Sequence, residues 1–215
     1  MSPAADPQAR IAEICAAAPV VPVLTVERPE QAGPLARALV EGGLTALEVT
    51  LRTSAALEAI AEMRRAAPEA HVGVGTLRTA ADVAAAVEAG AVFGVSPGAT
   101  PALLDAAEAA GLAMLPGAAT ASEAMALAER GYRTMKFFPA SAAGGRPLLK
   151  SLAAPLPDLA FCPTGGIDAA GAADWLALPN VVCVGGSWVA PAAALVDGDW
   201  DRIRELAREA AALPR

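Results

Sequence analysis

Short apolar segments alternate along this chain with longer segments whose apolar residues recur at helical spacing. The apolar segments are rich in Val and Leu, and nearly all of them stop at Gly, Pro or Thr, as buried strands do. Their starts recur at intervals of about 20 to 26 residues. Eight segments are predicted as strands: Val20–Val26, Thr45–Leu51, His71–Thr76, Val92–Val95, Leu112–Leu115, Thr134–Phe138, Ala160–Cys162 and Val181–Val184.

The alternation of strand and helix predicts the fold class. Strands that are apolar on both faces are typical of a parallel sheet covered by helices. Eight of them, each followed by a helix, predict an α/β fold of the closed (β/α)8 kind, a TIM barrel, with a doubly wound sheet as the alternative. An extra N-terminal helix at about residues 7–18 precedes a barrel of about residues 20–212. No linker or low-complexity segment divides the chain, so residues 1–215 are expected to form a single domain.

Composition excludes two classes of protein. Hydrophobic residues make up 55% of the chain and charged residues 18%, and the mean hydropathy of +0.44 is too high for a disordered protein. The formal net charge is −7, whereas a nucleic-acid surface requires clustered Lys and Arg. We therefore expect neither disorder nor a nucleic-acid partner.

Location and metal chemistry follow from a few residue types. The uncharged segment 175–196 is interrupted by Pro and Gly and is flanked by acids, so it predicts buried strand and loop and no membrane partner. The three cysteines and a start without a signal-peptide pattern predict reduced thiols in a cytoplasmic protein. His71 is the only histidine, so we expect no His-based metal site and no metal.

Lys136 breaks the apolar pattern of a predicted strand, because it lies between bulky apolar neighbours in Thr-Met-Lys-Phe-Phe-Pro-Ala. Burial disfavours a charged ammonium and favours the neutral amine. A neutral amine is the form that attacks a carbonyl carbon. Lys136 is therefore a candidate nucleophile, and the alternative is a lysine whose head group extends from the strand end into water.

Glu48 is a second charged residue inside a predicted strand. Because side chains alternate along a strand, Glu48, Thr50 and Arg52 share one face. This pattern is compatible with an internal ion pair. It is equally compatible with a general acid/base beside an arginine that holds an anionic substrate.

Glycine pairs follow the last two predicted strands, in Pro163-Thr164-Gly165-Gly166 and in Gly185-Gly186-Ser187. Loops at these positions of a (β/α)8 barrel commonly bind phosphate through backbone N–H groups. Thr76 and Pro97 end the third and fourth strands, where barrel active sites are built, and Phe138 shares a strand face with Lys136. Turn formation and core packing are the alternative roles for these three.

Eight short strings in this order resemble one family, class I 2-keto-3-deoxy-6-phosphogluconate (KDPG) aldolase and 4-hydroxy-2-oxoglutarate aldolase. The resemblance covers about residues 11–208. The strings are Val-Pro-Val (21–23), Leu-Glu-Val-Thr-Leu-Arg-Thr (47–53), Gly-Val-Gly-Thr (73–76), Val-Ser-Pro-Gly (95–98), Leu-Pro-Gly (115–117), Lys-Phe-Phe-Pro-Ala (136–140), Phe-Cys-Pro-Thr-Gly-Gly-Ile (161–167) and Gly-Gly-Ser-Trp (185–188).

The resemblance implies a lyase of the Entner–Doudoroff pathway that forms a covalent imine and needs no cofactor. It implies that Lys136 is the Schiff-base lysine and Glu48 the acid/base. It places Arg52, Thr76, Pro97 and Phe138 around the pyruvyl group and Gly165, Gly166 and Ser187 at the phosphate.

The resemblance also implies a homotrimer that acts on a keto-acid phosphate. Thr25 lies where some relatives carry an arginine late in the first strand. Other readings of the residues remain: the same lysine chemistry on the galactonate epimer, an isomerase or decarboxylase that uses the same phosphate loops, or a scaffold without activity.

Overall fold

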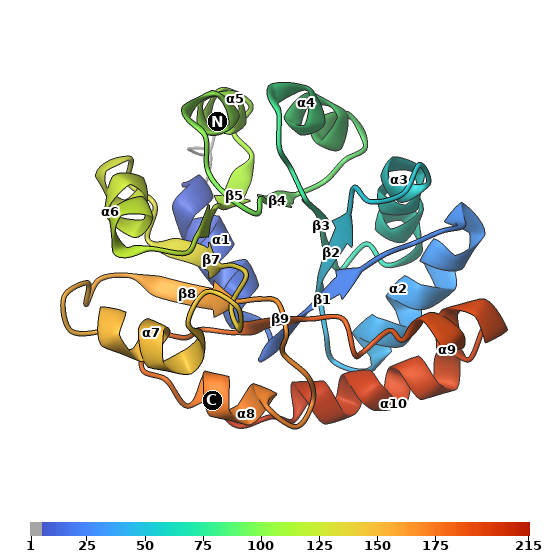
Figure 1. Ribbon diagram of the computed structural model, residues 1–215. Helices are drawn as coiled ribbons and strands as arrows, with labels where there is room; N and C mark the ends of the chain where they lie inside the picture. Colours follow the sequence, from blue (N-terminus) through green and yellow to red (C-terminus); the bar gives the residue numbers. More distant parts are fainter. Residues whose placement is uncertain (1–5) are drawn as a thin grey trace.

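The computed structural model describes residues 6–215 as parallel strands that alternate with helices (Figure 1). The strands are β1 (Val20–Leu24), β2 (Ala46–Thr50), β3 (His71–Gly75), β4 (Phe93–Val95), β5 (Ala113–Leu115), β6 (Gly117–Ala118), β7 (Thr134–Phe137), β8 (Ala160–Pro163) and β9 (Val184–Gly186). The helices are α1 (Pro7–Ala16), the 3₁₀ helix η1 (Pro29–Gln31), α2 (Ala32–Glu41), α3 (Ala56–Ala66), α4 (Ala80–Glu88), α5 (Pro101–Ala109), α6 (Ala121–Glu129), α7 (Gly145–Leu152), α8 (Ala172–Leu176), α9 (Ala192–Asp197) and α10 (Trp200–Ala211).

The strands pair in parallel, in the orders β5-β4-β3-β2-β1-β9 and β6-β7-β8. Isolated bridges from Phe161 to Val181 and from Thr164 to Gly185 connect β8 with the segment of β9. On the other side, the Lys136 amide on β7 donates to the Pro116 carbonyl between β5 and β6. Figure 1 shows the strands curling around a common axis with helices outside them. The predicted α/β class with a parallel, barrel-like sheet is confirmed.

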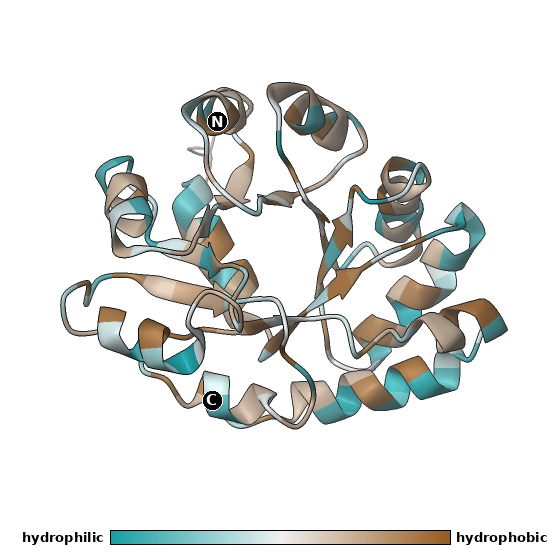
Figure 2. Ribbon diagram, in the orientation of Figure 1, coloured by the Kyte–Doolittle hydropathy of each residue, from teal (hydrophilic) through white to brown (hydrophobic). Residues whose placement is uncertain are grey.

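Side-chain alternation separates two hydrophobic clusters. On β8, Phe161 belongs to the large outer cluster between strands and helices, whereas Cys162 belongs to a smaller inner cluster. Helix α1 contributes Ile11, Ile14 and Cys15 to the inner cluster and covers the amino-terminal end of the sheet. The outer helices are amphipathic, as the teal and brown bands of α10 in Figure 2 show.

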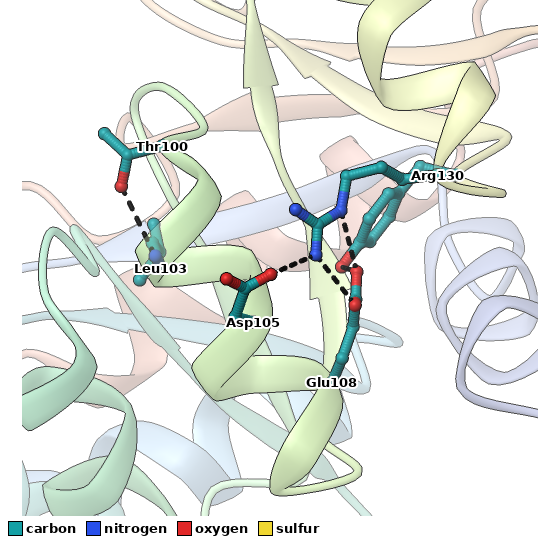
Figure 3. Close-up of polar contacts among 6 residues, drawn as sticks. Thr100, Leu103, Asp105, Glu108 and Arg130 are labelled. Carbon is teal, nitrogen blue, oxygen red and sulfur yellow. Dashed lines mark hydrogen bonds and ion pairs between the residues drawn. The ribbon is translucent and has the colours of Figure 1, made fainter.

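Several helix ends carry the signals that sequence predicts. Thr100 caps α5 by accepting from the Leu103 amide, and Thr120 forms a capping box with Glu123 at the start of α6. At the end of α6, Arg130 binds Asp105 and Glu108 of α5 and thereby joins two neighbouring helices (Figure 3).

The last strand differs from its prediction. We predicted Val181–Val184 with the glycine pair after it, but β9 runs from Val184 to Gly186 and includes both glycines. Gly185 and Gly186 pair with β1, at Val21 and Pro22. Glycine has a low intrinsic strand preference, so pairing with β1 overrides the local signal.

Two other elements also differ from their predictions. The two-residue strand β6 was not predicted, because Pro116 interrupts its apolar run. Helix α1 ends at Ala16, two residues before the predicted end.

Within residues 6–215, no helix is both long enough and apolar enough to cross a membrane.

The three cysteine thiols are free and lie together in the inner cluster. Contact with Cys15 and Cys162, together with burial, raises the pKa of Cys183 well above its usual range. A raised pKa leaves few reactive thiolates. These residues are therefore packing residues of the inner cluster. In the described part of the chain, no group of three or more His, Cys, Asp or Glu side chains is arranged as a metal site.

Candidate active site

Lys136 and Glu48 meet inside the curved sheet. Lys136 lies on β7 and Glu48 on β2, 88 residues apart in sequence, and the Lys136 Nζ–Glu48 Oε1 distance is 3.3 Å. Their side chains are only 7% and 3% exposed, respectively. The contact allows a proton to pass directly between amine and carboxylate, which both candidate roles require.

Strand alternation explains why both charged groups lie inside. On β7, Met135 and Phe137 face the outer cluster, so Lys136 between them faces inward. On β2, Leu47 and Val49 face the outer cluster and leave Glu48 on the inner face. The alternative interpretation of Lys136, a head group that extends into water, is thereby excluded.

The amine opens into a small cavity at the carboxyl ends of the strands. This cavity has a volume of about 130 Å³. The ring centroid of Phe138 lies 5.2 Å from Lys136 Nζ, close enough for a cation–π contact. The lining residues are Val23, Arg52, Lys136, Phe138, Thr164, Gly165, Gly166, Ile167, Gly185, Gly186 and Ser187.

Six of the nine predicted site residues therefore line one cavity, and Glu48 contacts it through Lys136. Thr76 and Pro97 lie just beyond the ends of β3 and β4 but are not among the lining residues. Thr76 nevertheless has an unusual backbone, with φ of 67°. Non-glycine residues with positive φ are strained and gather at functional sites.

Arg52 supplies positive charge at the mouth of the cavity. It follows β2 by two residues and is exposed. Among residues 6–215, no carboxylate lies within ion-pair distance of its guanidinium. A guanidinium without a partner can bind a carboxylate with two parallel hydrogen bonds.

Glycines form part of the cavity wall. Gly165 and Gly166 have φ values of 104° and 73°, a conformation that favours glycine and exposes backbone groups. Ser187 adds a hydroxyl directly after β9. Such a wall presents neutral hydrogen-bond donors to an anion.

Sequence reasoning missed Val23 and Thr164 as cavity residues. Val23 faces inward on β1, and Thr164 is buried next to the glycine pair. The alternation of side chains along a strand could have found them. Val23 lies two residues after inward-facing Val21, and Thr164 lies two residues after inward-facing Cys162.

Thr25 bonds locally. Its hydroxyl lies 3.3 Å from the hydroxyl of Thr50, which itself donates to the Leu24 carbonyl. The side chain of Thr25 therefore forms a hydrogen bond that links the carboxyl ends of β1 and β2.

A larger hollow of about 720 Å³ lies at the opposite end of the sheet, before β8 and β9. Its only charged lining residue is Asp158. Active sites of parallel barrels lie at the carboxyl ends of the strands, which favours the smaller cavity around Lys136.

Comparison with known proteins identifies the family of this chain. The family model described as KDPG and KHG aldolase matches residues 11–206. The KHG/KDPG aldolase of Escherichia coli K12 is 50% identical over 192 residues, which cover 89% of this chain and 90% of that relative.

Two solved structures have the same overall fold. The KDPG aldolase of Zymomonas mobilis ZM4 with 3-phosphoglycerate is 47% identical, with a TM-score of 0.91 over 97% of this chain and 98% of that one. The KDPG aldolase of Legionella pneumophila, with pyruvate captured at low pH as a covalent carbinolamine, is 43% identical, with a TM-score of 0.91 over 94% and 98%. This chain therefore belongs to the family of KDPG and KHG aldolases.

Proposed function

We propose that this protein is a class I aldolase that cleaves KDPG to pyruvate and glyceraldehyde 3-phosphate. We propose that it also acts on 4-hydroxy-2-oxoglutarate. The observation that carries the proposal is the buried contact between Lys136 Nζ and Glu48, beside a cavity that is lined by an arginine and by four glycines. Aldolase chemistry requires an amine, a proton carrier and two anion sites, and these residues supply all four.

The first half of the reaction forms the imine. Lys136 Nζ attacks the C2 ketone, and the C2 oxygen takes up a proton to give a carbinolamine. Glu48 donates a further proton to the C2 hydroxyl, which leaves as water and gives a protonated imine. The Legionella relative was captured at the carbinolamine stage with pyruvate, and this mechanism requires the same intermediate.

The second half breaks the carbon–carbon bond. The Glu48 carboxylate accepts the proton of the C4 hydroxyl, the C3–C4 electron pair moves into the imine, and glyceraldehyde 3-phosphate departs. Glu48 then returns a proton to C3 of the enamine. Addition of water to C2 releases pyruvate and restores the free amine. The imine itself accepts the electrons, so no cofactor is part of the proposal.

The remaining residues hold the substrate. Arg52 and Thr76 are proposed to bind the pyruvyl carboxylate, and Pro97 and Phe138 to wall the pocket, which aligns C2 with the amine. Gly165, Gly166 and Ser187 are proposed to bind the phosphate. Their contribution is binding energy remote from the reacting carbons.

A wider set of properties belongs to the same proposal. We propose that residues 1–215 form one complete (β/α)8 TIM-barrel domain with α1 as an extra N-terminal helix. The parallel pairing and the bridges between β8 and β9 support this architecture. We further propose a homotrimer in the cytoplasm, supported by the family resemblance, and light scattering of the purified protein measures the trimer directly.

Borohydride trapping tests the proposed chemistry. Treating the protein with pyruvate and borohydride reduces the imine to a stable adduct, which peptide mass mapping locates. Lys150 is the only other lysine in the chain and provides a matched control. We expect the adduct in wild type and K150Q but not in K136Q. A folded wild type without an adduct on Lys136 contradicts the proposal.

The alternative substrates are separated by kinetics. The galactonate epimer differs from KDPG at one stereocentre, and 4-hydroxy-2-oxoglutarate lacks the phosphate. We expect kcat/KM to be highest for KDPG, because 4-hydroxy-2-oxoglutarate lacks the phosphate that the glycine loops are proposed to bind. The relative from Pseudoalteromonas atlantica, 50% identical over 194 residues, is moreover named for the gluconate-derived substrate. A higher kcat/KM for the galactonate epimer reassigns the substrate but leaves the lysine chemistry in place.

A further inference from the structure

The inner face of β3 (His71–Gly75) carries glycine at its last two positions. Val72 and Val74 of this strand face the outer cluster. The alternating residues Gly73 and Gly75 therefore face inward, where neighbouring strands carry large side chains. Neither glycine has a positive φ, so the backbone conformation itself does not call for glycine. The reason for glycine must lie in the space that a side chain would fill.

At Gly75 that space is filled by Glu48. A methyl group on Gly75 would lie 2.8 Å from Cγ and 2.9 Å from Cδ of Glu48 and would overlap Oε1. Carbon atoms that are not bonded approach each other to about 3.5 Å at closest comfortable contact. The side chain of Glu48 therefore rests directly on the backbone of β3. The same Oε1 lies 3.3 Å from Lys136 Nζ.

Gly73 makes room for a different group. A methyl group there would lie 2.5 Å from Cδ1 of Phe93, an inner-cluster residue on β4. The two glycines thus lie on the same face of the same strand, and a neighbouring side chain packs closely against each of them. The atoms nearest the added methyl group belong to Phe93 at Gly73 and to the Glu48 side chain at Gly75.

We infer that Gly75 is a positioning residue, whose missing side chain lets the Glu48 carboxylate lie within proton-transfer distance of Lys136 Nζ. The Glu48 side chain packs against the backbone of β3. A side chain at position 75 would push the carboxylate away from this backbone and change its distance to Lys136 Nζ. The catalytic consequence rests on the proposed function, because Glu48 must carry protons for its position to matter.

The test uses a step in which Glu48 acts without aldol cleavage. When pyruvate forms the imine, Glu48 removes a proton from C3, so the pyruvate methyl group exchanges with deuterated water. Nuclear magnetic resonance follows this exchange, and borohydride trapping measures the imine itself. A displacement of about 1 Å in a catalytic group costs up to about 100-fold in rate. We expect G75A to slow exchange at least tenfold while still forming the borohydride adduct.

Removing the Glu48 side chain reveals whether the methyl group acts through Glu48. E48A takes away Cγ, Cδ and both oxygens, so G75A meets no side chain atom of residue 48 in that background. Because E48A also lacks the proton carrier, the two backgrounds are compared by urea unfolding: we expect G75A to lower the urea midpoint of the wild type and to leave that of E48A unchanged. G73A is the matched control and should lower the urea midpoint but keep the exchange rate, relative to adduct formation, within about threefold of wild type.

Exchange in folded G75A within threefold of wild type overturns the inference. An equal fall of the urea midpoint from G75A in the wild-type and E48A backgrounds overturns it as well. If G75A does not fold, recovery of folded protein in G75A/E48A supports the inference, and failure of both variants contradicts it. A wild type that forms no adduct and exchanges no methyl protons refutes the proposed function instead, and the urea midpoints of G75A and G75A/E48A then decide whether Glu48 rests on Gly75.

Discussion

Replacing Lys136 by methionine should make the stability of this protein fall as pH rises. The substitution keeps an unbranched side chain of similar length but removes the cation beside Glu48. The Glu48 side chain is 3% exposed, and Lys136 is the ion-pair partner that the structure gives it. In the variant, the carboxyl group must therefore keep its charge without a cation or take up a proton.

The free energy needed to protonate Glu48 sets an upper limit on the stability that K136M can lose. An unperturbed glutamate has a pKa of about 4.3, so protonating it costs about 3.7 kcal/mol at pH 7 and about 1 kcal/mol at pH 5. A carboxyl group held neutral in the folded state adds stability that is fully present below the unfolded pKa and is lost as pH rises. K136M should thus lose up to about 2.6 kcal/mol of unfolding free energy between pH 5 and pH 7.

Urea unfolding of K136M and K136M/E48Q at several pH values measures this effect. The double variant lacks the titrating carboxyl group, so every other pH-dependent contribution is shared and cancels in the difference. We expect the difference between the two variants to change by about 1 to 2.6 kcal/mol over this range. A change below about 0.5 kcal/mol would show that water hydrates the carboxylate and that the site is not dry.

Three further predictions concern other parts of the molecule. Burial and the charge of Glu108 raise the pKa of Tyr132 above its usual range. Phenolate absorbance should therefore be missing from the folded protein just above pH 10, and stability should fall there more steeply in wild type than in Y132F; phenolate absorbance from folded protein contradicts this. T76N should raise the unfolding free energy by about 1 kcal/mol, since asparagine tolerates positive φ better than threonine, and an unchanged urea midpoint argues against strain. The backbone hydrogen bond from Ala119 lowers the pKa of Glu123, so its stabilising effect should be present above the ordinary pKa and disappear in acid, and E123Q should flatten that acid limb of the stability curve.

The sequence predicts the inner and outer faces of the strands well. Period-two alternation places Lys136 and Glu48 inside, because their neighbours in sequence are apolar and pack against helices. The 3.3 Å contact between them cannot be predicted in this way. It depends on how far the sheet curls, which is set by the pairing of all the strands between β2 and β7.

Glycine limits what the sequence predicts near the site. Gly185 and Gly186 lower the local strand signal, so the last strand was placed too early, although both residues pair with β1. The positive φ of Thr76 is equally invisible, because threonine rarely adopts it and the surrounding structure imposes it. For Gly75 the residue type alone suggests a turn, and only the position of Glu48 reveals its spatial role.

Because α1 covers the amino-terminal end of the sheet, the native cysteines can report how often this end opens. Cys15, Cys162 and Cys183 account for every sulfhydryl in the chain, and each is at most 2% exposed. A maleimide can reach them only after the terminal helix lifts or the whole chain unfolds. The alkylation rates with and without pyruvate therefore measure how strongly pyruvate bound at the carboxyl ends of the strands suppresses opening at the amino-terminal ends.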